Sequence, residues 1–123
     1  MIVGIGVDVV DLARFERALD RTPALVTRLF TDREQTQAGR VLSLRSLAGR
    51  FAAKEALIKA LGESTGIRWH DMQVIANELG NPGFELSGPA ADVAARRGIS
   101  AVHLSMSHDA GIAIAYVVAE SGA

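Results

Sequence analysis

The segment from Ser43 to Leu61 is the feature that most limits what this chain can fold into. It is rich in Ala and Leu, contains no Pro, and is followed by Gly62, a residue that commonly ends helices. The sequence therefore predicts one helix of about five turns. The chain has 123 residues, a length that fits a single domain over residues 1–123. We expect this helix to lie at the centre of that domain.

Predicted strands lie on both sides of this helix in the sequence. Ile2 to Val10 has the β-branched, Gly-punctuated pattern of a buried strand. Four further strands form two adjacent pairs, each joined by a short turn: Met72 to Glu78 with Gly83 to Leu86, and Ala101 to Ser107 with Ile112 to Ala119. Adjacent strands of this kind indicate an α+β fold with a small mixed, largely antiparallel sheet.

Three shorter helices are predicted from residues that cap helix ends. Asp11 is a suitable N-cap for a helix that ends near Asp20. Thr31 and Glu34 form a capping box, so a further helix should begin immediately after Thr31. Ser87 precedes the last short helix, which has Pro in its first turn.

Composition excludes several classes of protein. The net charge of −1 argues against a protein that mainly neutralises nucleic-acid phosphates. The absence of cysteine excludes disulfides, thiolate metal sites and a cysteine nucleophile. The apolar N-terminus lacks the basic region of a signal peptide, and no apolar run is long enough to span a bilayer. We therefore expect a cytoplasmic enzyme or binding module with no membrane partner.

Two carboxylates are candidates for chemistry. Asp8 lies in an apolar strand, where it must be paired, hydrogen-bonded, metal-bound or at an exposed strand end. Glu55 lies on the long helix among the cations Arg50, Lys54 and Lys59. These residues could form an ordinary solvated face with a Glu–Lys pair one turn apart. From these residues alone the solvated face is favoured, but they are also compatible with a phosphate site, because Mg²⁺ takes one or two carboxylates plus phosphate oxygens.

His108 is the third candidate. It lies at the end of a predicted strand, on the same face as Leu104 and Met106, and is followed by Asp109. A neighbouring carboxylate can orient or charge an imidazole, although a plain turn histidine has the same pattern. The chain has neither a Walker loop nor a dinucleotide-binding glycine motif.

Four segments together resemble the holo-acyl-carrier-protein synthases, in that family's order and from end to end of the chain. Gly6 to Val10 resembles the family's Gly-Ile-Asp opening, and Arg50 to Ala60 looks like its central helix motif. Gly80-Asn81-Pro82 resembles its Gly-Lys-Pro or Gly-Arg-Pro turn. Leu104 to Asp109, followed by Ala113 to Ala115, resembles its Ser-x-(Ser/Thr)-His strand and last strand.

This resemblance implies a phosphopantetheinyl transferase fold and a specific reaction in fatty acid and lipid biosynthesis. The 4′-phosphopantetheine group of coenzyme A is transferred to a serine of apo acyl carrier protein, with Mg²⁺ as cofactor, and adenosine 3′,5′-bisphosphate is released. The resemblance also implies a homotrimer with active sites at subunit interfaces, and a small apolar-rich chain gains core by such sharing. The alternative is a non-catalytic module that binds coenzyme A or a nucleotide.

The resemblance also implies roles for individual residues. Asp8 and Glu55 match the family's Mg²⁺ ligands and, with Lys59 and His108, are the expected catalytic residues. We hypothesise that the base is Glu55, or a metal-bound water that Glu55 or Asp8 orients, with His108 as the second choice. The expected contacts to coenzyme A are Arg50, Lys54, Lys59, Gly62, Asn81, Pro82, Gly83, Ser107 and His108. Asn81 departs from the family pattern, which has a cation at this position.

A basic stripe on the first helix is a candidate docking surface for the carrier protein. Arg14, Arg17 and Arg21 recur at helical spacing on one face. The carrier proteins of this family are acidic, so the stripe would accelerate and orient encounter more than it would add affinity. The alternative is an ordinary solvated basic face.

Overall fold

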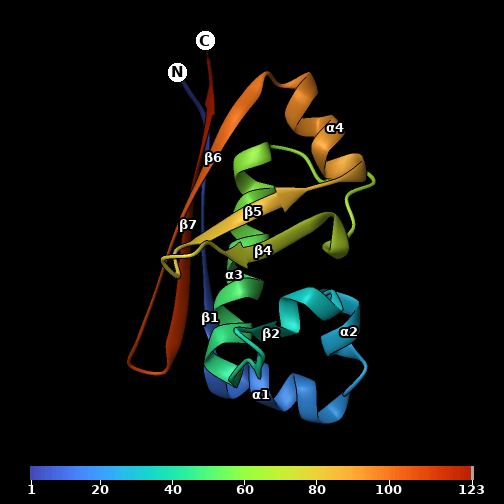
Figure 1. Cartoon of the computed structure of the whole chain (residues 1–123), viewed down its shortest axis with the longest axis vertical. Helices are drawn as coiled ribbons and strands as arrows, with labels where there is room; N and C mark the ends of the chain where they lie inside the picture. The colour runs from blue at the N-terminus through green and yellow to red at the C-terminus, as the bar shows by residue number, and fades with distance from the viewer. Residues whose placement is uncertain (123) are drawn as a thin grey trace.

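Helix α3 (Leu44–Leu61) is the element against which the others pack (Figure 1). The structure is a computed structural model and describes residues 1–122. Ser43 caps the start of α3 by accepting a hydrogen bond from the Ser46 amide, and Gly62 ends it with a φ of 83°. Both ends of the helix therefore agree with the sequence prediction.

The main sheet covers one side of α3. Its strands are β1 (Ile2–Asp11), β7 (Ile112–Ser121) and β6 (Ile99–Asp109), in the antiparallel order β1-β7-β6. The side chains of β7 that face the helix are small and fully buried, and they are Ala113, Ala115, Val117 and Ala119. Small residues on β7 allow α3 to lie close across β1 and β7.

The remaining elements cover the other side and the ends of α3. The hairpin of β4 (Met72–Ala76) and β5 (Pro82–Leu86) crosses the helix on the side opposite the main sheet (Figure 1). Helix α4 (Gly88–Arg96) lies near one end of the molecule, and α1 (Leu12–Arg21) and α2 (Leu25–Leu29) lie near the other. The shortest elements are η1 (Asp32–Gln35), β2 (Thr36–Gln37), β3 (Arg40–Val41) and η2 (Trp69–Asp71).

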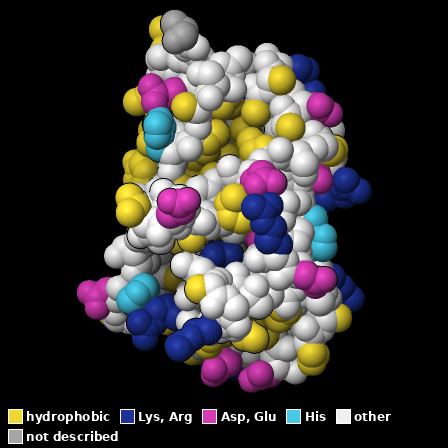
Figure 2. Space-filling model, viewed as in Figure 1, with side chains coloured by type: hydrophobic (Ala, Val, Ile, Leu, Met, Phe, Trp, Pro, Cys, Tyr) yellow, Lys and Arg dark blue, Asp and Glu magenta, His cyan; other side chains and the backbone are white. Residues whose placement is uncertain are grey.

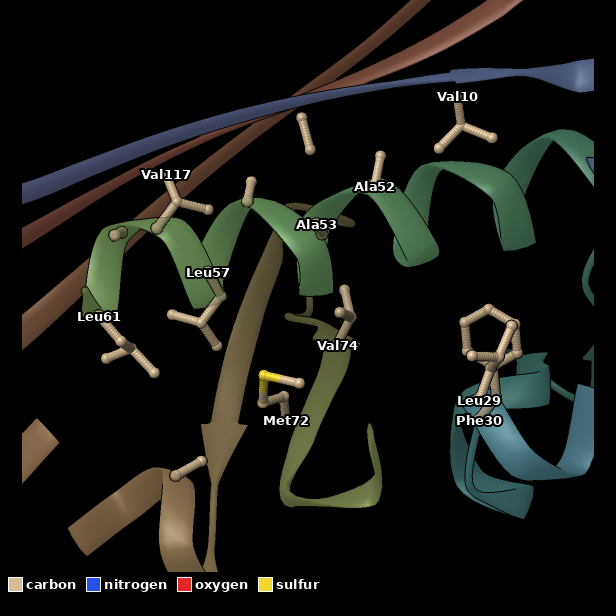
Figure 3. Close-up of a cluster of buried hydrophobic side chains, with 14 of the residues drawn as sticks. Val10, Leu29, Phe30, Ala52, Ala53, Leu57, Leu61, Met72, Val74 and Val117 are labelled. Carbon is tan, nitrogen blue, oxygen red and sulfur yellow. The ribbon is translucent and has the colours of Figure 1, made fainter. Parts of the chain in front are cut away.

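The hydrophobic core lies on two sides of α3, as Figure 3 shows. Val10 and Val117 fill the space between the helix and the main sheet. Leu57 points to the other side, toward Met72 and Val74 of β4. Since α3 is buried on both sides, it is a core helix with no single apolar stripe.

The predicted α+β class, long central helix and antiparallel strand pairs are confirmed, and every strand pair in residues 1–122 is antiparallel. The helix expected after Thr31 is wrong in type, because only the four-residue 3₁₀ helix η1 forms there. Its capping box, between Thr31 and Glu34, is present. Helix α2 was not predicted, since five residues are too few to show a helical period.

Strand β1 is not the fully buried strand that its composition predicted. It is an edge strand, and its outward side chains Val7 and Val9 are 42% and 53% exposed. Val7 pairs with Tyr116 across the sheet, which extends the same uncovered surface. We call this surface the outer sheet face; its exposed apolar side chains are Ile5, Val7, Val9, Ile112 and Tyr116. No helix within residues 1–122 is long and apolar enough to cross a membrane.

Candidate active site

Strand β1 and helix α3 bring Asp8, Glu55 and Lys59 together at one edge of the main sheet. The Lys59 Nζ lies 3.3 Å from Asp8 Oδ1 and donates a hydrogen bond of 2.8 Å to the Val7 carbonyl oxygen. In the described part of the chain Lys59 thus pairs with Asp8, and not with Glu55 as helical spacing alone suggested. Asp8 and Glu55 line a common hollow of ≈370 Å³, which we call the carboxylate hollow.

The carboxylate of Glu55 is electrostatically unfavourable in this position. Burial raises the pKa of Glu55, the like charge of Asp8 raises it further, and the Lys59 ammonium partly offsets both effects. The hollow is lined by the carboxylates of Asp8, Asp11 and Glu55 and by Arg14, and the Lys59 ammonium lies beside Asp8, so negative charge is in excess. This arrangement favours a cation bound between Asp8 and Glu55.

The donor set of the carboxylate hollow fits Mg²⁺. Within residues 1–122 no cluster of three or more His, Cys, Asp or Glu side chains is placed to bind a metal. A dedicated protein cage is therefore absent from the described chain. Mg²⁺ is typically bound by one or two carboxylates, with phosphate oxygens and waters as the remaining ligands. Asp8 and Glu55 supply that minimal set, and the mutual repulsion of their charges would be relieved by a divalent cation.

A larger hollow of ≈600 Å³ lies on the other flank of α3. We call it the large hollow. It is bounded by Met106, Ser107 and His108 on β6, by Arg50 of α3, and by the turn before β5. Figure 2 shows basic side chains beside a histidine on this face of the molecule, over the β6–β7 turn. The two hollows have no lining residue in common, because α3 lies between them.

The large hollow contains several of the residues expected to contact coenzyme A. Arg50, Pro82, Ser107 and His108 all line it. Asn81 belongs to the same turn, whose shape is fixed because the Asn77 Oδ1 accepts hydrogen bonds from the amides of Leu79 and Asn81. These two hydrogen bonds hold the backbone of the turn with no cationic side chain at position 81.

The N-terminus of α3 also faces the large hollow, and this was not predicted from the sequence. Ser43, Arg45 and Ser46 line it, and Gln37 lies beside them. The first turn of a helix presents unpaired amide groups and a positive dipole end, which together favour anions. The helix was predicted to begin near Ser43, but the direction in which that helix end points could not be predicted from the sequence.

Residues 4–117 match the family model described as the 4′-phosphopantetheinyl transferase superfamily. The chain belongs to this superfamily. A holo-[acyl-carrier-protein] synthase of Clavibacter michiganensis is 60% identical, and the match covers 100% of this chain and 99% of that protein.

Solved structures of the same family agree with the fold. The holo-[acyl-carrier-protein] synthase of Neisseria meningitidis has a TM-score of 0.84 and 40% identity, covering 98% of this chain and 100% of its own. The Helicobacter pylori enzyme, solved in complex with coenzyme A, has a TM-score of 0.82 and 32% identity, covering 94% of this chain and 99% of its own. The predicted transferase fold is therefore confirmed.

Lys54 belongs to the superfamily's central helix motif but lies at neither hollow. Its side chain is fully buried, and its Nζ donates to Glu34 Oε1 at 2.7 Å, to the Leu29 carbonyl at 2.6 Å and to the Trp69 carbonyl at 2.9 Å. All three N–H groups are thus used internally. The expected contact between Lys54 and coenzyme A does not agree with this position, and its observed role is to attach α2, η1 and η2 to α3.

Arg50 and Glu34 extend the same buried network. The Arg50 Nη1 donates to the carbonyl oxygens of Glu34 and Val74, at 2.8 and 2.9 Å. The second carboxylate oxygen of Glu34 accepts from the Val74 amide at 2.9 Å. Burial lowers the pKa values of both Arg50 and Lys54, and the charge of Glu34 partly offsets this. Arg50 therefore stabilises the wall of the large hollow through these hydrogen bonds, and its guanidinium is largely occupied by partners within the chain.

Gly62 does not line either hollow. It ends α3 in a left-handed conformation, and a Cβ added there would lie 2.0 Å from the Arg97 Nη1. That guanidinium donates to the Leu61 carbonyl at 2.7 Å and so satisfies a free carbonyl at the helix end. The left-handed backbone favours glycine at this helix end, and the expected contact of Gly62 with coenzyme A stays a prediction.

The basic stripe of α1 lies beside the carboxylate hollow. Arg14 lines that hollow together with Phe15 and Phe51, whose rings stack with centroids 5.5 Å apart. Arg17 and Arg21 are exposed on the same helix. The position and the exposure of the stripe are therefore compatible with docking of an acidic partner next to the carboxylates.

Replacing Asp8 by Asn is expected to lower the pKa of Glu55, because the like charge that raises it is removed. The measurement is an NMR titration of the Glu55 side-chain carboxyl carbon in metal-free buffer. Glu120→Gln, at the far end of β7, is the matched control and should leave the Glu55 pKa unchanged. An unchanged Glu55 pKa in Asp8→Asn would mean that the two carboxylates do not interact.

Proposed function

We propose that this chain is a holo-acyl-carrier-protein synthase. It transfers 4′-phosphopantetheine from coenzyme A to a serine of apo acyl carrier protein and releases adenosine 3′,5′-bisphosphate, as a cytoplasmic step of fatty acid biosynthesis. The observation that carries the proposal is the grouping of Asp8, Glu55 and Lys59 in a chain of the phosphopantetheinyl transferase superfamily. The names of its relatives and the coenzyme A complex of the Helicobacter pylori enzyme support it.

Asp8 and Glu55 are the residues that would hold Mg²⁺ in this enzyme. When bound, the ion neutralises charge on the pyrophosphate of coenzyme A. The side chain of Lys59 is 54% exposed and its Nζ is beside Asp8, so it can reach a phosphate oxygen at the rim of the carboxylate hollow. Phosphoryl-type transfer requires mainly positioning and charge stabilisation of this kind.

Glu55 is our candidate for the base. The serine Oγ of the carrier protein forms a bond to the β-phosphorus while the bond from that phosphorus to the bridging oxygen breaks. The bridging oxygen leaves with the adenosine 3′,5′-bisphosphate, and Lys59 stabilises its negative charge. The serine proton passes to an oxygen of the Glu55 carboxylate, which lies in the same hollow as Asp8.

The large hollow is the proposed position of the nucleotide part of coenzyme A. Ser107 and His108 line it as the family resemblance implied, and Arg45 adds a cation next to the N-terminus of α3. Arg45 and the free amides of that helix end can supply the positive charge that Asn81 lacks. His108 is therefore assigned to binding and not to proton transfer.

Two observations support a homotrimer with active sites at subunit interfaces. The large hollow and the carboxylate hollow lie on opposite flanks of α3, so a site made of both is more readily formed between two copies than within one. The outer sheet face is apolar and uncovered in a single copy. Repeated contact of one such surface with a different surface of the next copy can close into a ring.

The assembly is tested by sedimentation equilibrium. The expected mass is about three times the 13.0 kDa of the chain, and Val7→Lys should lower both the assembled fraction and the activity because it buries a charge in the interface. Val41→Lys is the matched control, since Val41 is 83% exposed on β3 and lies outside the outer sheet face. A fully active monomer, or equal behaviour of the two variants, would contradict the proposal.

Transferase activity is tested by incubating the chain with apo acyl carrier protein, coenzyme A and Mg²⁺. The mass of the carrier protein is then measured by mass spectrometry. The expected gain is about 340 Da, the mass of the transferred group. Glu55→Gln should reduce the rate by at least about a hundredfold, because it removes both a ligand and the base. Glu63→Gln, just after the end of α3, should retain the rate.

Other outcomes of the same experiment would identify other functions. Release of adenosine 3′,5′-bisphosphate without a change in carrier mass would indicate a phosphohydrolase. Binding of coenzyme A without either product would indicate a non-catalytic module. A full rate in Glu55→Gln with Mg²⁺ present would remove Glu55 as the base.

Carrier docking on the basic stripe is tested by charge reversal. Arg14→Glu should raise the KM for carrier protein about tenfold and leave coenzyme A binding unchanged, because opposite charges across an interface orient the encounter. Arg96→Glu introduces the same charge change on α4, at the other end of the molecule, and serves as the control. An unchanged carrier KM in Arg14→Glu would show that the stripe is only a solvated face.

A further inference from the structure

Gly6 lies where strand β1 comes nearest to helix α3, close to the two carboxylates. We propose that Gly6 is a positioning residue, which sets the spacing between Asp8 and Glu55 by allowing β1 to lie directly on the backbone of α3. The inference rests on the proposed metal role of these carboxylates. It adds to that role a residue that has no functional group of its own.

The contact between β1 and α3 leaves no space for a side chain. A Cβ added to Gly6 would lie 1.9 Å from the Ala56 carbonyl oxygen and 3.0 Å from the Lys59 Cβ. A Cβ added to Gly4 would lie 1.9 Å from the Ala60 carbonyl oxygen. The two carbonyl oxygens, of Ala56 and Ala60, belong to the helix backbone, so neither can move aside as a flexible side chain would. Only glycine permits this approach.

The two glycines make the same contact at different distances from the carboxylates. Gly6 is two residues before Asp8 on the same strand and meets the helix at Ala56, the residue after Glu55. Gly4 meets the helix one turn later, at Ala60, and lies next to an irregularity in the pairing of β1 with β7. Only the contact at Gly6 therefore acts directly on the gap between Asp8 and Glu55.

A side chain at Gly6 would disturb a geometry with little tolerance. Ordinary contact begins near 3.4 Å, so a Cβ now at 1.9 Å requires a local separation of about 1.5 Å. Mg²⁺ binds its oxygen ligands at about 2.0–2.1 Å in near-octahedral geometry. A shift of Asp8 away from Glu55 by that amount would remove one carboxylate from the ion.

The test compares Gly6→Ala with Gly4→Ala. Binding of Mn²⁺, used as a probe in place of Mg²⁺, is measured by water-proton relaxation with saturating coenzyme A, and the KM for Mg²⁺ is measured in the transferase assay. Thermal unfolding reports the loss of stability, which both variants should share. Gly6→Ala should raise the Kd for Mn²⁺ and the KM for Mg²⁺ at least tenfold, whereas Gly4→Ala should change neither by more than about threefold.

The outcomes separate this inference from the proposed function. If the wild-type chain bound no Mn²⁺, the proposed metal role would be wrong. If the wild type bound Mn²⁺ and the two glycine substitutions lowered the Mn²⁺ affinity equally, Gly6 would have only a structural role and the inference would be overturned. If Gly6→Ala does not fold in the assay buffer, both glycine variants are compared at lower temperature with a stabilising osmolyte, where the same difference in Mn²⁺ affinity is expected.

Discussion

The close approach of β1 to α3 is the contact on which the rest of the structure depends. Glycine on the strand meets backbone carbonyls of the helix, and the residues of β7 beside them are alanine and valine. Small residues here reduce the apolar area available for burial, so the core must be completed on the other side of α3 by Leu57, Met72 and Val74. The same approach brings Asp8, early in the chain, to the middle of a helix that begins at residue 44.

Burial separates the roles of two lysines in one helix motif. Lys54 is fully buried and surrounded by three oxygen acceptors, whereas Lys59 is half exposed beside Asp8. A buried ammonium must be paired and fully hydrogen-bonded, and removing one partner of such a pair typically costs about 3–5 kcal/mol. Lys54 and Glu34 are therefore fixed by the requirements of the fold, and Lys59 remains free to act on a ligand.

Local features of the fold were predictable from sequence because they depend on neighbouring residues. The capping of α3 by Ser43, its end at Gly62 and the two hairpins all follow from short-range rules. The direction in which residues of α3 point was not predictable, because a helix buried on both sides has no polar face to mark its orientation. Lys54 was therefore assigned to the ligand from the family resemblance, and nothing in the sequence marked it as buried. The exposure of β1 was missed because its β-branched composition is that of a buried strand.

The candidate site was predictable in its members but not in its arrangement. Asp8, Glu55 and Lys59 carry side chains suited to metal and phosphate, and their proximity follows from the contact of β1 with α3. The separation of the large hollow from the carboxylate hollow follows from the same contact, because a helix that lies close on β1 and β7 also blocks the path between them. In the proposed trimer the close packing that forms the carboxylate pair also requires a second copy to supply the nucleotide site. Assembly and catalysis would then have one physical cause, the position of α3 on the sheet.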